Sequence, residues 1–285
     1  MPSSLSSSNQ KVAVVTGSSS GIGFETSLTL ARNGFLTYAT MRNLGKGATI
    51  QSVATKEGLP IRVVQLNVTE ERSINDAIHS IKSDVGKIDV LVNNAGYGLN
   101  GAFEDLAMEE IKAQYETNLF GVIRVTQAVL PIMRKQKSGI IINISSAAGR
   151  FGYPGESAYV STKFAIEGLS ESIVYELEPF GIRVVLVEPG PIRTNFADGM
   201  VATKKSQNPN SPYLEIMKKL NAVLASIREN ASSPDLVAKV VLKAVTSENP
   251  SLRYLAGKDM ETWMEAKRSM SDEDFRKTIK QNFMK

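Results

Sequence analysis

The chain has 285 residues, 42% of them hydrophobic, with 33 basic residues against 29 acidic ones and no cysteine. A net charge of +4 scattered along the chain gives no basic patch for nucleic acid, and the lack of cysteine excludes disulfides, thiol nucleophiles and cysteine-based zinc sites. No apolar run reaches the roughly 20 residues that a membrane-spanning helix needs. The composition is compatible with the reducing cytoplasm, where we expect the protein, and the serine-rich residues 1–10 are expected to form a disordered tail.

The first predicted unit is a strand, a glycine-rich turn and a helix. Residues 11–17, KVAVVTG, form a short β-branched run that stops at glycine, as buried parallel strands do, and a helical pattern follows over residues 24–33. Gly17, Gly21 and Gly23 lie between them and let a pyrophosphate approach backbone amides at the helix N-terminus. A dinucleotide is therefore the expected ligand, and a tight turn that binds nothing is the alternative.

The second predicted strand, residues 35–43, carries a cue to the type of dinucleotide. It ends about 20 residues beyond the glycine turn, where NAD sites usually place an acidic residue on the ribose 2′-hydroxyl. This chain has Arg42 there instead, and a guanidinium suits a 2′-phosphate. We therefore predict NADP(H) over NAD(H), with a solvated surface arginine as the alternative.

Two further strands are predicted over residues 61–68 and 88–96. The first of them ends in Asn67 and Val68, which would line an adenine pocket. The amphipathic helix between the two strands carries the only histidine, His79, next to its apolar side. We expect His79 to be solvated, so another group must transfer protons.

The pattern continues with a long helix around residues 108–134, a fifth strand over 139–145, a helix to about residue 178 and a sixth strand over 181–190. Strands that alternate with helices predict an α/β fold: a Rossmann-type, doubly wound parallel sheet of about seven strands with helices on both faces, in a single domain over residues 11–285. Ligands of such sheets bind at the carboxyl ends of the strands. The residues at those ends are Gly17, Asn93, Ser145, Ser146 and Pro189.

One pair of side chains has the spacing of a tuned proton donor. Tyr159 and Lys163 are four residues apart, so on a helix they share one face. Tyr254 and Lys258 repeat the spacing, but they fall on a predicted last strand, where such residues stand about 13 Å apart. The first pair is therefore the candidate, and a surface helix pair is its alternative reading.

Five motifs in this order resemble the short-chain dehydrogenase/reductase family over about residues 11–195. They are TGSSSGIG at 16–23, NNAG at 93–96, Asn118, the spacing of Ser146, Tyr159 and Lys163, and PGPIRT at 189–194. The chain departs from the pattern at Asn67, where many members have aspartate, although an amide can still bond an adenine amino group.

The resemblance implies an NADP(H)-dependent oxidoreductase that interconverts a ketone or aldehyde and an alcohol by hydride transfer. Tyr159 would be the general acid/base, with its pKa lowered by the Lys163 ammonium and the oxidised nicotinamide. Ser146, rather than Ser145, would hold the substrate oxygen, and Asn118 would fix a water that links Lys163 to solvent. No metal is implied, and a homodimer or homotetramer is expected.

The resemblance also implies which residues hold the cofactor. Lys163 would bond the nicotinamide ribose, and Thr194 with the Ile192 backbone would face the carboxamide. The full set is Gly17, Ser19, Ser20, Gly21, Ile22, Gly23, Arg42, Asn67, Val68, Asn94, Ala95, Gly96, Tyr159, Lys163, Pro189, Gly190, Ile192 and Thr194.

The irregular segment 195–233 is predicted to be a lid over the substrate. An apolar inner face would favour a lipophilic or medium-sized carbonyl, whereas ordinary helix core explains the same residues equally well. The apolar residues in question are Phe196, Met200, Tyr213, Met217 and Leu220. Tyr97, Phe151 and Tyr153 either line the pocket or pack, and the helical stretch 259–285 packs on the domain or on a partner subunit.

Two other functions are compatible with the fold. One is a regulatory or scaffold protein that binds a dinucleotide without turnover, which would have no chemical need for Ser146, Tyr159, Lys163 and Asn118 together. The other is an epimerase or dehydratase that uses the same tyrosine and lysine. Such enzymes generally carry a larger substrate domain than the chain has room for beyond Asn195.

Overall fold

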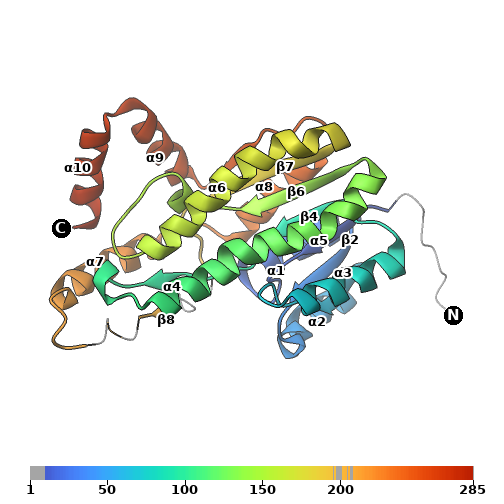
Figure 1. Cartoon of the computed structure of the whole chain (residues 1–285), viewed down its shortest axis with the longest axis horizontal. Coiled ribbons are helices and arrows are strands. Elements are labelled where there is room, and N and C mark those ends of the chain that lie inside the picture. Colours follow the sequence, from blue (N-terminus) through green and yellow to red (C-terminus); the bar gives the residue numbers. More distant parts are fainter. Residues whose placement is uncertain (1–9, 195, 197–200, 204, 206–207, 285) are drawn as a thin grey trace.

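The computed structural model describes residues 10–284, apart from 195, 197–200, 204, 206 and 207 (Figure 1). Most of the predicted tail, together with Asn195 and Met200 of the predicted lid, lies outside the described residues. Among the described helices, none is long and apolar enough to cross a membrane.

A sheet of seven parallel strands forms the centre of the molecule, in the order β3-β2-β1-β4-β6-β7-β9. Its strands are β1 Val12–Val15, β2 Leu36–Met41, β3 Ile61–Gln65, β4 Val90–Asn93, β6 Gly139–Ile144, β7 Ile182–Pro189 and β9 Arg253–Ala256. The strands β1, β4 and β6 are short runs rich in valine and isoleucine. Helices cover both faces of a parallel sheet, so the side chains on both sides of each strand are buried and apolar. The prediction of a single-domain, doubly wound α/β fold is confirmed.

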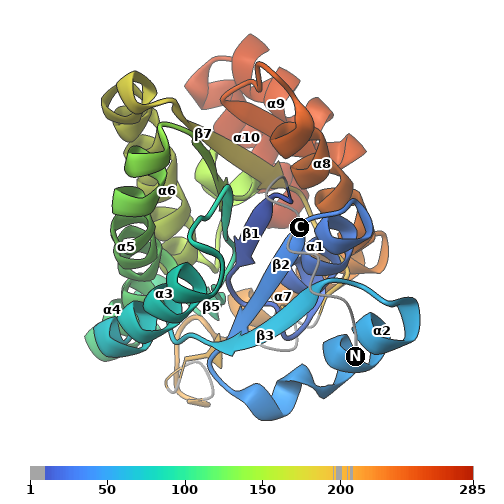
Figure 2. The ribbon, with the colours of Figure 1, turned by 90° about the vertical axis from the view of Figure 1, so that its right-hand side faces the viewer.

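Helices cover both faces of this sheet (Figure 2). One layer consists of α3 Glu71–Val85, α5 Gly121–Gln136 and α6 Ser157–Leu177, and the other contains α1 Gly21–Arg32 and α8 Pro234–Thr246. The helix α2 Ala48–Glu57 lies beside the β3 edge. Because side chains alternate along a strand, β1 sends Val12 and Val14 into one apolar core and Ala13 and Val15 into the other.

The helix α3 shows how the sequence pattern places one of these layers. Ile74, Ile78 and Ile81 recur at helical spacing and are buried against the sheet. Gly86 follows the helix in the left-handed conformation, with φ 75°, and ends it. His79 is exposed on this helix, as predicted.

The long helix predicted around residues 108–134 is interrupted, which corrects the sequence reading. The structure has α4 Met108–Tyr115, a π-helical turn Glu116–Phe120 and then α5. π-Helical turns inside helices occur frequently at functional sites. Here the turn contains Asn118, which is 1% exposed and therefore faces the interior.

A second, two-stranded sheet was not predicted. It pairs β5 Leu99–Asn100 with β8 Val201–Ala202 in parallel. Two side-chain hydrogen bonds continue this connection: Ser211 donates to Asp105 Oδ2 at 2.7 Å, and Tyr213 donates to Glu104 Oε2 at 2.7 Å. The segment after β7 is therefore attached to the loop that follows β4.

The last helices form a third apolar cluster beside the sheet. The helix α7 Leu214–Glu229 contributes Met217, Leu220 and Leu224. The helices α9 Lys258–Ser269 and α10 Asp272–Phe283 pack onto these residues. Met217 and Leu220 of the proposed lid face thus belong to a packed core, and the C-terminal helices pack on the domain itself.

Candidate active site

The glycine turn after β1 forms a cradle that side chains would fill. Gly17 has φ +70°, and a Cβ there would lie 2.9 Å from the Cα of Ala95. A Cβ on Gly23 would lie 2.4 Å from the carbonyl oxygen of Gly17. Ser20, the N-cap of α1, makes no capping bond with its own side chain. The open helix N-terminus and the close backbone approach fit a pyrophosphate.

The other residues of this turn that were predicted to hold the cofactor differ in their exposure. Ser19 and Ile22 are half-buried, and Ser20 is exposed at the start of α1. Ile22 packs against the core on the α1 side of the sheet.

The motif at 93–96 fixes the shape of this cradle. Thr16 Oγ1 accepts hydrogen bonds from the backbone amides of Asn94 at 2.9 Å and Ala95 at 3.1 Å. The Asn94 side chain donates back to the carbonyl oxygen of Thr16 at 2.9 Å. Asn93 donates to Asn143 Oδ1 at 2.9 Å inside the sheet. The side chain of Asn94 therefore holds the turn, and Gly96 is exposed next to it.

The segment after β7 reaches the same cradle. Pro189 ends β7, Gly190 follows it, and Ile192 forms an isolated parallel bridge to the segment before α8. The Cβ of Thr194 lies 3.2 Å from the position that a Cβ on Gly21 would take. The motif at 189–194 thus runs from the sheet edge to the glycine turn.

Arg42 lies directly after β2 at the carboxyl edge of the sheet, and it is exposed. Its carbonyl oxygen accepts a hydrogen bond from Gln65 at 3.2 Å. Among the described residues, no carboxylate forms an ion pair with its guanidinium. That guanidinium can therefore bind an anion without breaking an existing pair.

Asn67 and Val68, at the end of β3, make contacts within the protein. Asn67 Oδ1 already accepts two hydrogen bonds from Thr69, at 3.3 and 3.0 Å, and its Nδ2 donates to Glu70 at 2.7 Å. A carbonyl oxygen has two lone pairs, so an adenine amino group would have to displace one of these bonds. Val68 is buried and packs closely on Gly121 of α5.

Tyr159 and Ser146 meet at the start of α6. Tyr159 is 7% exposed, and burial raises the pKa of its phenol, the Ser146 hydroxyl lowers it and the Glu156 carboxylate raises it further. Ser146 caps the 3-10 turn that follows β6, where its Oγ accepts a hydrogen bond from the amide of Ala148 at 3.2 Å. With these protein groups alone, the phenol keeps its proton at neutral pH and is a proton donor.

Lys163 lies one turn further along α6 and is also buried. Its Nζ donates a hydrogen bond to the carbonyl oxygen of Ile144 at 2.8 Å, and it lies 5.6 Å from the centre of the Tyr159 ring. Burial lowers the pKa of Lys163 to about 8, whereas the Glu167 carboxylate acts in the opposite direction. The pair is thus an internal one, which excludes the reading as a surface helix pair.

Asn118 holds the neighbouring loop. Its Oδ1 accepts a hydrogen bond from the amide of Tyr97 at 3.1 Å, and its Nδ2 donates to the carbonyl oxygen of Tyr97 at 2.9 Å and to Thr162 Oγ1 at 3.3 Å. Gly96 lies against the side-chain amide of Asn118, because a Cβ on Gly96 would be 3.1 Å from Asn118 Oδ1. The side chain of Asn118 therefore fixes the loop after β4 beside α6.

The three aromatic residues considered for the pocket differ in their surroundings. Phe151 is buried and stacks on Trp263 at 5.4 Å, and Tyr153 stacks on Phe283 at 5.5 Å, so both pack against the C-terminal helices. Tyr97 is half-buried beside Asn118.

Phe196, from the predicted lid, contacts Tyr159. Its ring centre lies 5.6 Å from that of Tyr159, and 37% of its surface is exposed. An apolar group of this segment therefore lies against the ring of Tyr159.

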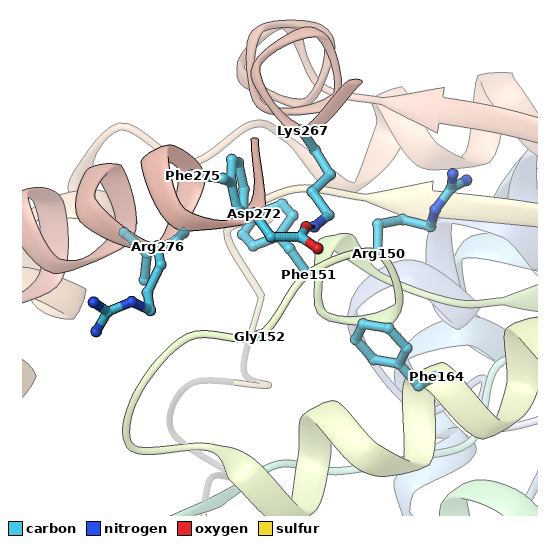
Figure 3. Close-up of a pocket in the computed structure, with 9 residues that line it drawn as sticks. Arg150, Phe151, Gly152, Phe164, Lys267, Asp272, Phe275 and Arg276 are labelled. Carbon is cyan, nitrogen blue, oxygen red and sulfur yellow. Dashed lines mark hydrogen bonds and ion pairs between the residues drawn. The ribbon is translucent and has the colours of Figure 1, made fainter. Parts of the chain in front are cut away.

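A surface groove lies outside this site, between α6 and the helices α9 and α10 (Figure 3). Phe164 and Phe275 give it apolar walls, while the guanidinium groups of Arg150 and Arg276 point away from it. Lys267 turns toward Asp272, with which it forms an ion pair of 2.8 Å. Two of the charged groups thus point away from the groove, and the other two pair with each other beside it.

Sequence reasoning missed a buried ionic cluster beside Lys163. Glu167 on α6 and Glu188 on β7 both contact Arg253 of β9, at 3.1 and 3.0 Å. A signal was present, because Glu188 is a single acidic residue inside the apolar run of β7. Only its position on the sheet could show that its partners come from β9 and from the turn after β6.

The chain matches the family model described as "short chain dehydrogenase" over residues 11–205. A protein named 3-ketodihydrosphingosine reductase, from Bacteroides thetaiotaomicron, is 36% identical over 251 residues, which is 87% of this chain and 88% of its own length. Retinol dehydrogenase 8 from Bos taurus is 37% identical over 254 residues, or 85% of this chain and 80% of its own length.

Two solved structures extend the likeness to three dimensions. A short-chain dehydrogenase from Streptomyces avermitilis superposes with a TM-score of 0.81 at 31% identity, covering 95% of both chains. A metagenomic short-chain oxidoreductase in complex with NADP gives a TM-score of 0.70 at 28% identity, covering 87% of this chain and 98% of that one.

Proposed function

The chain belongs to the short-chain dehydrogenase family and is an oxidoreductase, and from that premise we propose that it interconverts a carbonyl and an alcohol with NADP(H). The observation that carries this proposal is the burial of Tyr159 next to Ser146 and Lys163, at the edge of the sheet where the glycine cradle opens.

The residues of the cradle fit a dinucleotide. Gly17, Gly21 and Gly23 keep the turn tight, because a side chain at each would meet the protein opposite. The backbone amides of this turn and of the N-terminus of α1 would receive the pyrophosphate. Arg42, which has no ion-pair partner among the described side chains, would bind a 2′-phosphate and so favour NADP(H) over NAD(H). When bound, the nicotinamide cofactor supplies or accepts the hydride.

The protein's own groups would handle the proton. In reduction, the Tyr159 phenol would give its proton to the substrate oxygen, and in oxidation the phenolate would take one. Ser146, whose hydroxyl lowers the pKa of Tyr159, would hold the substrate oxygen beside the phenol. Lys163, anchored by the carbonyl oxygen of Ile144, would bond the ribose hydroxyls and contribute positive charge that stabilises the phenolate.

The substrate proposed is a lipophilic carbonyl or alcohol of medium size. Phe196 places an apolar ring against Tyr159, and the pairing of β5 with β8 attaches this part of the predicted lid to the loop after β4. The names of two similar proteins, a 3-ketodihydrosphingosine reductase and a retinol dehydrogenase, support this class. The segment 195–233 would then act as the cover of the substrate site.

The test is a screen of purified protein with NADPH and with NADH against ketones, aldehydes and quinones, followed by nicotinamide absorbance. We expect faster turnover with NADPH and a preference for apolar carbonyls. Tight NADPH binding without turnover of any substrate would favour the scaffold function instead. Conversion of a substrate without net change in nicotinamide absorbance would favour an epimerase or dehydratase.

Two further expectations accompany this function. We propose a homodimer or homotetramer, which light scattering of the purified protein would test. A cytoplasmic location remains a prediction.

A further inference from the structure

Glu167 lies one helical turn after Lys163 on the same face of α6. Residues four apart on a helix are neighbours, with about 6 Å of rise between them. Glu167 is 6% exposed and Lys163 is 7% exposed, so both ionisable groups lie inside the protein. Charges at this depth are screened little by water, and each affects the protonation of the other.

The arginine that contacts Glu167 also contacts two other carboxylates. Arg253 contacts Glu167 Oε2 at 3.1 Å and Glu188 Oε1 at 3.0 Å, and it also forms an ion pair with Glu171 at the surface. Arg150 contacts only Glu188 within this group, at 2.9 Å. Three carboxylates therefore share the guanidinium of Arg253. Its single positive charge cannot balance all of them, so the negative charge of Glu167 also acts on other cations nearby.

The second oxygen of Glu167 lies near the end of β6, the strand whose last carbonyl oxygen holds Lys163. Glu167 Oε1 is buried, and the Ser145 hydroxyl, also buried, is the polar group beside it. Glu167 Oε1 lies 3.2 Å from the position that a Cβ on Gly149 would take, and Ser145 Oγ lies 2.7 Å from the same position. Ser145 directly follows Ile144, whose carbonyl oxygen holds the Nζ of Lys163. The absent side chain at Gly149 thus lets the carboxylate approach the segment that anchors the lysine.

We propose that Glu167 is a positioning residue that keeps Lys163 in the charged ammonium form and thereby sets the alkaline limit of the reaction. Its effect on catalysis rests on the proposed function, whereas its effect on Lys163 does not. The ammonium is the form that contributes positive charge beside the Tyr159 phenol, so the reaction fails when Lys163 loses its proton.

The electrostatic balance gives the sign of the effect. Burial lowers the pKa of Lys163 to about 8, and the Glu167 carboxylate opposes that decrease. The pKa of Glu167 is itself raised by burial and by Glu188, and lowered by Ser145 and Arg253. The phenol of Tyr159 also faces the lysine, on α6. Removing the carboxylate leaves Lys163 buried without its opposing charge, which lowers its titration midpoint by about one pH unit.

The direct test follows the titration of Lys163 by NMR of protein labelled with ¹³C at the lysine ε-carbon. The signal is assigned by its loss in Lys163→Arg. In Glu167→Gln we expect the midpoint to fall by about one pH unit. In the matched control Glu171→Gln, which removes the exposed carboxylate on the same Arg253, we expect no change. Equal midpoints in the two variants would overturn the proposal.

Two measurements distinguish the loss of the Glu167 charge from a folding defect of the variant. Thermal unfolding reports whether Glu167→Gln folds like the natural protein. If it does not fold, Glu167→Asp, which keeps the charge on a shorter side chain, provides the test. Because the charge is kept, we expect its Lys163 midpoint to stay close to that of the natural protein, and a fall of about one unit would contradict the proposal.

The catalytic consequence is tested by the pH dependence of kcat/KM. We expect the alkaline limb of Glu167→Gln to move to lower pH by the same amount as the NMR midpoint, while Glu171→Gln follows the natural protein. An NMR shift in a protein that turns over no substrate would contradict the proposed function alone. An unchanged NMR midpoint in an active enzyme would contradict only the role of Glu167.

Discussion

Lys163 Nζ lies 5.6 Å from the centre of the Tyr159 ring, and its hydrogen bond goes to the carbonyl oxygen of Ile144, at 2.8 Å. The ammonium is therefore held beside the phenol by the end of β6. Because burial raises the pKa of Tyr159 and lowers that of Lys163, the two groups tend toward their neutral forms. The positive charges that favour the phenolate must act against this tendency.

The burial of Lys163 predicts a cost in stability. A decrease of its pKa from 10.5 to about 8 corresponds to about 3 kcal/mol at pH below 8. Because the folded protein binds fewer protons than the unfolded chain between these pH values, this cost disappears as the pH rises to 10.5. Lys163→Met should therefore have a larger free energy of unfolding than the natural protein at pH 7.

Urea unfolding of the natural protein and of Lys163→Met at several pH values would measure this difference. The advantage of the variant should shrink as the pH rises above about 8. A variant that is less stable at pH 7, or whose advantage does not depend on pH, would show that the ammonium is well compensated in the fold.

Arg42 predicts the cofactor preference. If Arg42 binds the 2′-phosphate, Arg42→Ala would remove a charge-assisted hydrogen bond, and the Kd for NADPH should rise about 10-fold or more. The Kd for NADH should stay unchanged. Arg72→Ala is the matched control, because that arginine is 95% exposed on α3. Equal losses for the two cofactors, measured by nicotinamide fluorescence, would assign Arg42 another role.

Adding a methyl group at Gly23 should disturb the glycine turn. A methyl group in Gly23→Ala would lie 2.4 Å from the carbonyl oxygen of Gly17 and 2.5 Å from Asn94 Nδ2, so the turn must open. Overpacking of this kind costs about 1–3 kcal/mol, and NADPH binding should weaken about 10-fold or more. Gly168→Ala is the control, because no atom beyond the neighbouring backbone of its own helix lies within 4 Å of its new methyl group. Calorimetric titration would compare both variants, and NADPH binding of Gly23→Ala equal to that of the control would contradict the cradle.

The strands, the helices and the glycine turn could be predicted from the sequence because each depends on local pattern. The apolar run of β4 and the spacing of Ile74, Ile78 and Ile81 determine their own burial once they fold. The π-helical turn at Asn118 has no comparable pattern, because its shape depends on bonds to the distant loop at Tyr97. The pairing of β5 with β8 likewise joins residues about a hundred positions apart.

The candidate site also has a part that could be predicted from the sequence and a part that could not. The motif residues could be named from the sequence, but their partners could not. Asn94 serves the glycine turn, and Asn67 is occupied by Thr69 and Glu70. The spacing of Lys163 and Glu167 can be seen in the sequence, but the ion-pair partner of Glu167, Arg253, comes from β9, which no local pattern indicates.

The role of Tyr159 as the proton donor is tested most directly by the steady-state kinetics of Tyr159→Phe on the best carbonyl substrate. NADPH binding is measured in parallel, and Tyr175→Phe, in which a tyrosine 77% exposed on the same helix is changed, serves as the control. If Tyr159 is the proton donor, kcat of Tyr159→Phe falls about 100-fold or more while the Kd for NADPH is unchanged. A variant that keeps the kcat of the natural enzyme would contradict this role.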